Sequence, residues 1–232
     1  MKKELKILAV FENKEFLKLW IGQIFSYLGD AIVQIALMAW VISLGGHSGS
    51  EMSKILFFFV LPALLLSPLA GALSDRFSRK TLMVLSNLFR ACLVFIIPVL
   101  LFSKFSTHLH TMVYAFSFLI GSGSAFFFPA KQSIIPNLVK SEHLQFANAL
   151  NAGTSTIAIL LGAVITGLYI SKFGLANSLW VNGFVYLASA IIISLISFNN
   201  SSVVSKIATK TDISASIKFV FNYLKTHKNT ED

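Results

Sequence analysis

The sequence predicts an all-helical membrane protein with six transmembrane helices. Of its 232 residues, 55% are hydrophobic and only 12% are charged, and the mean hydropathy is +0.75. A soluble domain has about a quarter of its residues charged. Six apolar runs reach the roughly 20 residues that a helix needs to cross the hydrocarbon layer. Helices are expected because lipid offers backbone groups no hydrogen-bond partner, and the alternation typical of membrane strands is absent.

The predicted spans, in order, are residues 17–44, 54–73, 81–102, 112–130, 146–170 and 176–198. The first run follows charged residues that continue to Lys18 and lacks a small-residue cleavage site, so we expect it to stay in the protein as a helix. Prolines within or at the ends of the runs are tolerated in membrane helices and can kink them.

The first span carries a polar stripe on an otherwise apolar helix. Gln23, Tyr27, Asp30 and Gln34 are spaced by four, three and four residues, with Ser26 alongside. A mid-span aspartate costs about 2.5–3.5 kcal/mol on insertion scales, so the stripe is expected to face protein or a wet cavity. Asp30 is therefore a candidate for binding a proton, a cation or a cationic substrate. The alternative is a structural hydrogen bond to a neighbouring helix.

The second and third spans are joined by a short turn, residues 71–80, with three cations and one anion. A turn this short makes its two helices antiparallel neighbours, and its cations are costly to carry across the membrane. Arg90 then lies nine residues beyond Thr81, roughly 14 Å into the third span. Asn87, one turn earlier, can share its hydrogen bonds. We expect Arg90 to act as a structural tether.

The fourth and fifth spans carry small and polar residues along one face. In the fourth span these are Tyr114, Ser117, Gly121 and Ser124. In the fifth span they include Asn148, Asn151 and Ser155. Small residues let helices approach closely, and polar residues hydrogen-bond across helices. The face of the fourth span can equally line a cavity, and the two interpretations stay open. In the fifth span, where Gly162 and Gly167 follow, packing is favoured and a glycine-lined bend is the alternative.

Cations gather in alternate gaps between the spans. We assign fifteen to one side, in the N-terminal arm, the 71–80 turn, the fourth gap with Lys131 and Lys140, and the tail. Three lie on the other side. The positive-inside rule then places both termini in the cytoplasm. The tail, residues 199–232, has apolar residues at helical spacing over about 212–226, which predicts an amphipathic helix at the membrane surface.

Other classes of function find no support. The chain has no phosphate-binding glycine loop, no metal-ligand cluster and no base–nucleophile pair, so we expect neither an enzyme nor a cofactor or metal site. Its basic residues form no patch with interleaved aromatics, which argues against nucleic acid as a partner. The single cysteine, Cys92, excludes an intrachain disulfide.

Residues 71–80, Gly-Ala-Leu-Ser-Asp-Arg-Phe-Ser-Arg-Lys, resemble the signature G-x-L-[AS]-D-R-x-G-R-[RK] that the major facilitator superfamily has between its second and third helices. Ser78 departs from the usual glycine. Residues 16–23 and 28–30, together with Phe128-Pro129-Ala130, resemble the macrolide-efflux and enterobactin-exporter branch. The resemblance extends over nearly the whole chain.

The resemblance implies one N-terminal six-helix half, built as a 3+3 inverted repeat. It further implies a second six-helix half as partner. The expected function is secondary active transport in the plasma (inner) membrane, as proton-coupled efflux of a drug-like or siderophore-like small molecule by alternating access. The alternative is a non-transporting membrane assembly partner or a remnant half-transporter.

The resemblance also suggests roles for particular residues. The expected substrate and proton pathway comprises Asp30, Gln23, Tyr27, Gln34, Tyr114 and Ser117. The expected gating loop comprises Gly71, Asp75, Arg76, Arg79 and Lys80, in which ion pairs close one side of the cavity.

Overall fold

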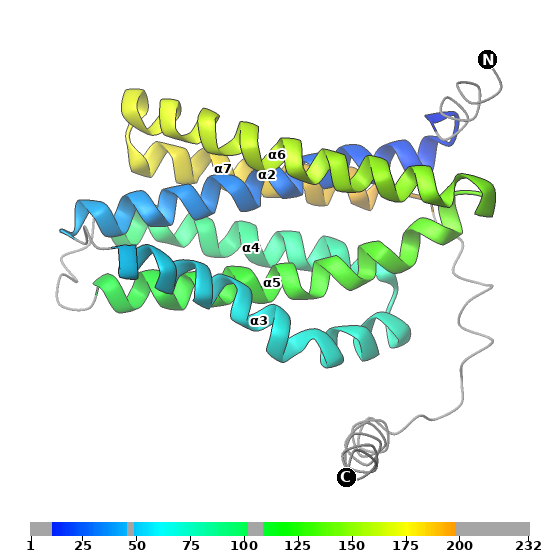
Figure 1. Cartoon of the computed structure of the whole chain (residues 1–232), viewed down its shortest axis with the longest axis horizontal. Coiled ribbons are helices and arrows are strands. Elements are labelled where there is room, and N and C mark those ends of the chain that lie inside the picture. Colours follow the sequence, from blue (N-terminus) through cyan, green and yellow to red (C-terminus); the bar gives the residue numbers. More distant parts are fainter. Residues whose placement is uncertain (1–10, 46–48, 102–108, 198–232) are drawn as a thin grey trace, which may run out of the picture. The chain divides into compact units, whose positions relative to one another are not determined.

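The computed structural model describes residues 11–45, 49–101 and 109–197, which form a bundle of six long helices (Figure 1). The helices are α2 (Lys14–Ser43), α3 (Gly49–Arg76), α4 (Arg79–Leu101), α5 (Leu109–Leu138), α6 (Leu144–Phe173) and α7 (Leu175–Ser194), with a short 3-10 turn, η2 (Ser141–His143), before α6. All six are long and apolar enough to cross a membrane. The predicted amphipathic helix at 212–226 lies outside the described residues.

The fourth span shows the largest difference from the prediction. It was expected to end at residue 130, but α5 continues to Leu138. The placement of Lys131 in a gap between spans is therefore wrong, because this residue lies within α5 and is fully buried. Its amine is held inside the bundle by the Tyr27 hydroxyl and by two aromatic rings, so the cation does not require the helix to end at the membrane surface.

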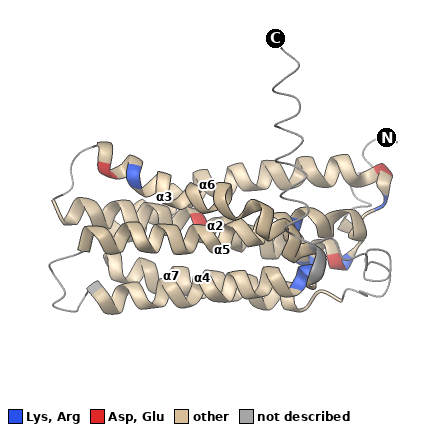
Figure 2. Ribbon diagram, turned by 90° about the horizontal axis from the view of Figure 1, so that it is seen from below, with Lys and Arg blue, Asp and Glu red and all other residues tan. Residues whose placement is uncertain are grey.

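Several Lys and Arg residues lie close together at one end of the bundle, which we call the basic end (Figure 2). Polar side chains there join the ends of different helices. Asn13 caps α2 by accepting from two backbone amides, and its Nδ2 donates to the Leu138 carbonyl at 2.5 Å. Lys18 and Lys80 donate to carbonyls just beyond α7 at 2.9 and 2.8 Å. Arg79 donates to a carbonyl near the end of α5 at 2.5 Å. Lys18 and Lys80 thus satisfy carbonyls that the C-terminus of α7 leaves unpaired, whereas Arg79 bonds a carbonyl five residues before the end of α5.

The helix pairings repeat when the first three helices are exchanged with the last three. Thus α3 packs on α5 as α6 packs on α2, α2 packs on α7 as α5 packs on α4, and α4 packs on α7. The two units are α2–α4 and α5–α7. Successive helices cross the bundle in alternate directions and each unit has three helices, so each helix of the second unit runs antiparallel to its counterpart in the first. This pairing is what an inverted repeat of two three-helix units produces.

Glycines set how closely the helices approach. A Cβ at Gly121 of α5 would lie 2.1 Å from the Phe59 carbonyl oxygen of α3, and one at Gly162 of α6 would lie 2.6 Å from the Ala31 Cβ of α2. Both positions belong to interfaces that the exchange of the two units relates. The small-residue faces of the fourth and fifth spans therefore do serve close packing at these points.

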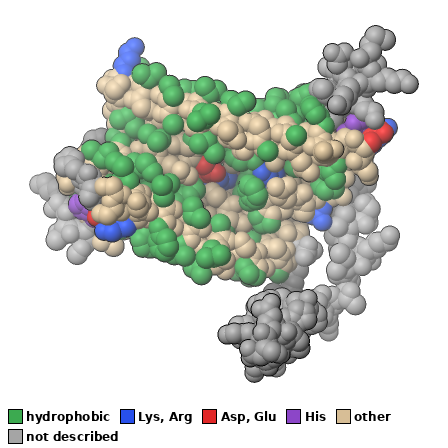
Figure 3. All heavy atoms as spheres, viewed as in Figure 1, with side chains coloured by type: hydrophobic (Ala, Val, Ile, Leu, Met, Phe, Trp, Pro, Cys, Tyr) green, Lys and Arg blue, Asp and Glu red, His purple; other side chains and the backbone are tan. Residues whose placement is uncertain are grey.

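The outer members of the bundle, α3 and α6, keep large apolar side chains exposed. Examples are Leu64 at 76% exposure and Leu168 at 68%. Figure 3 shows apolar side chains along much of this face, with acidic and basic atoms visible near its centre. A bilayer or another apolar protein surface is needed to cover such a face.

Candidate functional site

An ion pair lies at the centre of the bundle. Asp30 on α2 and Arg90 on α4 meet with 2.8 Å between Oδ1 and Nη1. Asp30 is sixteen residues from the start of α2, about 24 Å along the helix axis. The Arg90 side chain is fully buried, whereas the Asp30 side chain is 22% exposed. The pair therefore has one face sealed by protein and one face accessible.

Arg90 uses its remaining donors on three other side chains. Nη2 donates to Ser26 at 2.9 Å and to Asn87, the residue one turn earlier. Nη1 also donates to Ser124 on α5 at 3.1 Å. The expected hydrogen bond with Asn87 is thus confirmed. Because these partners come from α2, α4 and α5, a single, fully buried guanidinium links three helices.

Two features give Arg90 its space and further stabilise its charge. Its guanidinium carbon lies 5.0 Å from the Phe127 ring centroid and 4.7 Å from that of Tyr186. Cations above aromatic faces are stabilised by the ring quadrupole. Gly123 leaves room for the stem, because a Cβ there would lie 2.6 Å from the Arg90 Cγ. The sequence of α5 is therefore matched to an arginine on α4.

The hydrogen bonds to Asp30 all end on one oxygen. Oδ1 accepts from Arg90, from Tyr186 on α7 at 2.7 Å and from Ser124 at 3.3 Å. None of the described residues donates to Oδ2. A carboxylate with one oxygen held and the other free can accept a proton, and protonation removes its ion pair with the guanidinium.

A second polar cluster, which we call the Lys131 cluster, lies beside the first. Lys131 Nζ donates to the Tyr27 hydroxyl, which donates to Asn151 Oδ1 on α6 at 3.0 Å. Nζ also lies 4.1 Å from the Phe128 ring centroid and 4.9 Å from that of Tyr27. Tyr27 and Asp30 are one helical turn apart on α2, so the two clusters are neighbours along the same face.

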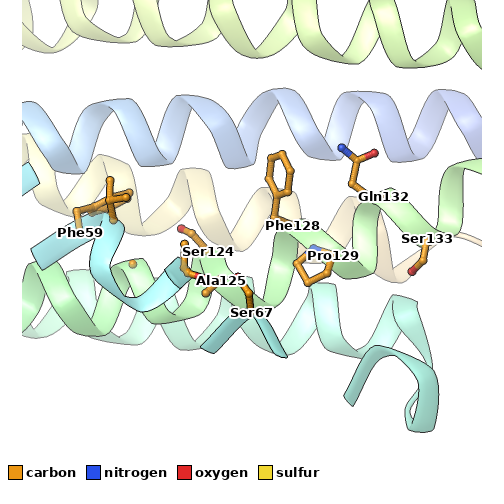
Figure 4. A pocket seen from close by; sticks show the side chains of 11 residues that line it. Phe59, Ser67, Ser124, Ala125, Phe128, Pro129, Gln132 and Ser133 are labelled. Atoms are coloured by element: carbon orange, nitrogen blue, oxygen red, sulfur yellow. Dashed lines mark hydrogen bonds between the residues drawn. The ribbon is translucent and has the colours of Figure 1, made fainter. Parts of the chain in front are cut away.

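A groove of about 670 Å³ runs between α3 and α5 (Figure 4). Its lining is mostly apolar and includes Phe59, Ala63 and Phe128, with Ser124 and Gln132 as polar members. Small-molecule sites have this composition, an apolar surface with a few polar groups that fix orientation. Ser124 connects the groove to the ion pair, because its hydroxyl contacts both Asp30 and Arg90.

The other predicted pathway residues take different places. Gln23 is buried and its Oε1 has no hydrogen-bond partner among the described residues. Gln34 is partly buried, one turn beyond Asp30. Ser117 is buried and donates to the Val113 carbonyl of its own helix. Tyr114 lies near the end opposite the basic end, where its hydroxyl donates to Glu51. Only Tyr27 and Asp30 therefore lie in the two central clusters.

The predicted gating residues lie at the basic end. Gly71 is within α3, and space is open around the position of its missing Cβ. Arg79 and Lys80 hydrogen-bond the carbonyls described above, at the ends of α5 and α7. The side chains of Asp75 and Arg76 lie outside the described part of the structure. A gating role for these residues stays a prediction.

Sequence reasoning missed two residues of these clusters and a third residue near the opposite end of the bundle. Tyr186 donates to Asp30, and Lys131 contacts Tyr27. Near the opposite end, Glu51 accepts from Tyr114 and pairs with Lys54 at 2.7 Å. A signal for Tyr186 was present: Asn182, Tyr186 and Ser189 are spaced by four and three residues on an apolar helix. Lys131 was hidden because its neighbours in sequence resemble the end of a span.

Comparison with known proteins identifies the family. The sequence profile of the Major Facilitator Superfamily matches residues 19–229. This chain belongs to that superfamily. It is thus a multi-pass membrane protein of a transporter family and not an enzyme. The resemblance inferred from the 71–80 turn is confirmed.

Three relatives illustrate the range of similar proteins. The chain is 28% identical to the uncharacterized MFS-type transporter YfiS of Bacillus subtilis, over 79% of the chain and 43% of YfiS. It is 31% identical to the lysophospholipid transporter LplT of Photorhabdus laumondii, over 72% of the chain and 39% of LplT. It is 26% identical to macrolide efflux protein A of Streptococcus pyogenes, over 69% of the chain and 39% of that protein. The chain spans about two-fifths of the length of these relatives.

Proposed function

We propose that this chain is one six-helix half of a secondary active transporter that exports a small, largely apolar molecule in exchange for protons. The observation that carries the proposal is the Asp30–Arg90 ion pair. It lies midway through the membrane with its carboxylate partly accessible and its guanidinium sealed. Ionisable groups at this depth are costly and mark ion or substrate pathways in membrane proteins.

Asp30 is the proton site in this proposal. When the cavity faces a compartment of higher proton activity, a proton reaches Oδ2 and neutralises the carboxylate. Arg90 then loses its ion-pair partner, although its bonds to Ser26, Ser124 and Asn87 can remain. Because these bonds join α2, α4 and α5, a change of charge on Asp30 alters the packing of these three helices against one another. Proton binding is thereby linked to a change of conformation.

The substrate binds in the groove between α3 and α5, beside this ion pair. A second six-helix half covers the exposed faces of α3 and α6 and completes the cavity, and the two halves rock about it. Because Lys131 lies within α5, fourteen cations remain on the basic side against three on the other. This bias supports a cytoplasmic basic end and export towards the opposite end. The macrolide efflux protein among the relatives supports the direction of transport and a drug-like substrate.

The test measures proton binding and proton-driven transport separately. In purified protein, infrared difference spectra recorded across a pH titration report how many carboxyls take up a proton. Asp30→Asn is expected to remove the signal of one carboxyl from inside the bundle, and Glu142→Gln, at an exposed position, is the control for loss of a carboxyl at the surface. In proteoliposomes containing the assembled transporter, a pH gradient is expected to drive uptake of radiolabelled dodecyl phosphate, and Asp30→Asn to abolish the gradient dependence. Uptake by Asp30→Asn with unchanged gradient dependence would remove Asp30 from the mechanism.

A further inference from the structure

Lys131 is a cation in the interior of the bundle and does not snorkel to the surface. The ends of α2 and α5 lie at one level, because Asn13 donates to the Leu138 carbonyl at 2.5 Å. From that level, Lys131 is about 10 Å along α5 and Tyr27 about 20 Å along α2. Cβ atoms lean towards a helix N-terminus, so Lys131 leans towards the centre and Tyr27 leans back towards the basic end. Their contact therefore lies about 15 Å from the basic end of two helices that are each about 45 Å long, and the Lys131 side chain is fully buried there.

Lys131 has no acidic partner among the described residues. Its amine has three donors, and the described contacts of Nζ are one hydrogen bond to Tyr27 and two aromatic rings. Asp30, the nearby acid, is bonded to Arg90. Away from the helix ends, the described Asp, Glu, Lys and Arg residues are Asp30, Arg90 and Lys131. Two cations thus face one anion in the membrane interior, where unpaired charge is costly.

An anionic group on a bound molecule can approach Lys131 through the groove. Phe128, Pro129 and Gln132 line the groove and flank Lys131 on α5. The Phe128 ring connects the two, because its centroid lies 4.1 Å from Nζ and Phe128 lines the groove and is 53% exposed. Figure 4 shows this ring projecting from α5. A change of its rotamer opens the amine to the groove, which places one cation at the end of an otherwise apolar site.

We propose that Lys131 binds the anionic group of the transported molecule, a carboxylate or phosphate attached to an apolar body. The proposal rests on the proposed function above, because it assigns a substrate class to the same groove. The anion replaces Tyr27 and the ring of Phe128 as partner of Nζ and balances the charge of the central clusters. The apolar body lies in the groove against Phe59 and Ala63.

The test measures binding to the purified full chain in nanodiscs, with signal from empty nanodiscs subtracted. The probe is 11-(dansylamino)undecanoate, whose fluorescence rises in an apolar site, and the matched neutral probe is dansyl undecylamide. Lys131→Met is expected to weaken binding of the acid about tenfold or more, as loss of a charge-assisted hydrogen bond requires. It leaves binding of the neutral probe unchanged. Lys131→Arg keeps the charge and retains binding of the acid.

Lys172→Met is the control for surface charge, since Lys172 lies in the last turn of α6 and is exposed. It removes the same charge and is expected to leave binding of the acid unchanged. Displacement by dodecanoate and by dodecyl phosphate shows which anion is preferred. Equal binding of the acid by Lys131→Met and the unsubstituted chain, or an equal loss in Lys172→Met, overturns the proposal.

Phe128→Ala supplies a second measurement that keeps Lys131 and does not depend on the folding of Lys131→Met. Removing the ring is expected to speed association of the acid severalfold and not that of the neutral probe; equal acceleration of both probes overturns the assignment. Asp30→Asn separates this proposal from the proposed function. It is expected to bind the acid at least as tightly, because a neighbouring negative charge is gone, while proton-driven transport is lost. If the unsubstituted chain binds the acid through Lys131 but its transport does not depend on the pH gradient, the proposed transport mechanism is refuted and the assignment of Lys131 stands.

Discussion

Gly121→Ala tests the packing of α3 on α5, the interface that contains the groove. The added Cβ would lie 2.1 Å from the Phe59 carbonyl oxygen, and 2.9 Å from its carbonyl carbon. A relaxed contact between carbon and oxygen is about 3.3 Å or longer. The helices must therefore separate locally by about 1 Å, and the backbone of α3 cannot turn aside as a side chain can. Overpacking of this kind costs typically 1–3 kcal/mol.

The matched control is Gly167→Ala. Gly167 lies in α6, and no heavy atom lies within 4 Å of the position of its missing Cβ. Alanine favours a helix by up to about 1 kcal/mol over glycine, so this variant is expected to be as stable as the unsubstituted chain or more so. Thermal unfolding in detergent, followed by tryptophan fluorescence, should show a midpoint several degrees lower for Gly121→Ala and no decrease for Gly167→Ala. A Gly121→Ala midpoint equal to or above that of the unsubstituted chain would refute the close approach.

Further predictions follow from the central clusters and the cap. Arg90→Met leaves the Asp30 carboxylate without its cation and should destabilise the bundle by about 2–4 kcal/mol; adding Asp30→Asn should recover at least half of that loss in the same unfolding assay. Tyr186→Phe removes one hydrogen bond to Asp30 and should cost about 1 kcal/mol, with a double-mutant cycle against Asp30→Asn showing the coupling. Asn13→Ala should cost about 1 kcal/mol through the lost cap, and an unchanged midpoint would count against that contact.

The helices were predictable because their signal is local. Each span is a run of apolar residues, and the bilayer fixes its minimum length. The Asn87–Arg90 contact was also predictable, since residues three apart share a helix face. The end of α5 was not. Hydropathy treats Lys131 as a residue that belongs in water, whereas the structure satisfies it with Tyr27, which is 104 positions away in the chain.

The partners of Asp30 could not be read from the sequence for the same reason. The polar stripe correctly indicated that Asp30 faces protein, because lipid cannot accommodate a carboxylate. Choosing between Arg90, 60 positions away, and Tyr186, 156 positions away, requires the order and rotation of the helices. These depend on close contacts such as Gly29 against the Tyr186 ring, where a Cβ would lie 2.7 Å from the nearest ring atom. The sequence does not show against which helix a glycine in an apolar run will pack.

The link between α6 and α7 is a single residue, Gly174, with φ 84° and ψ 164°. Residues other than glycine hardly enter this part of backbone space, and one peptide step spans only about 3.8 Å. The C-terminal end of α6 is therefore held close to the start of α7 and acts as the pivot for a tilt of α6. A tilt of about 10° around it would carry the other end of the 30-residue helix through about 8 Å. A tilt of α6 consequently produces its largest displacement at the basic end, where Asn13, Lys18 and Lys80 hold the neighbouring helices by hydrogen bonds.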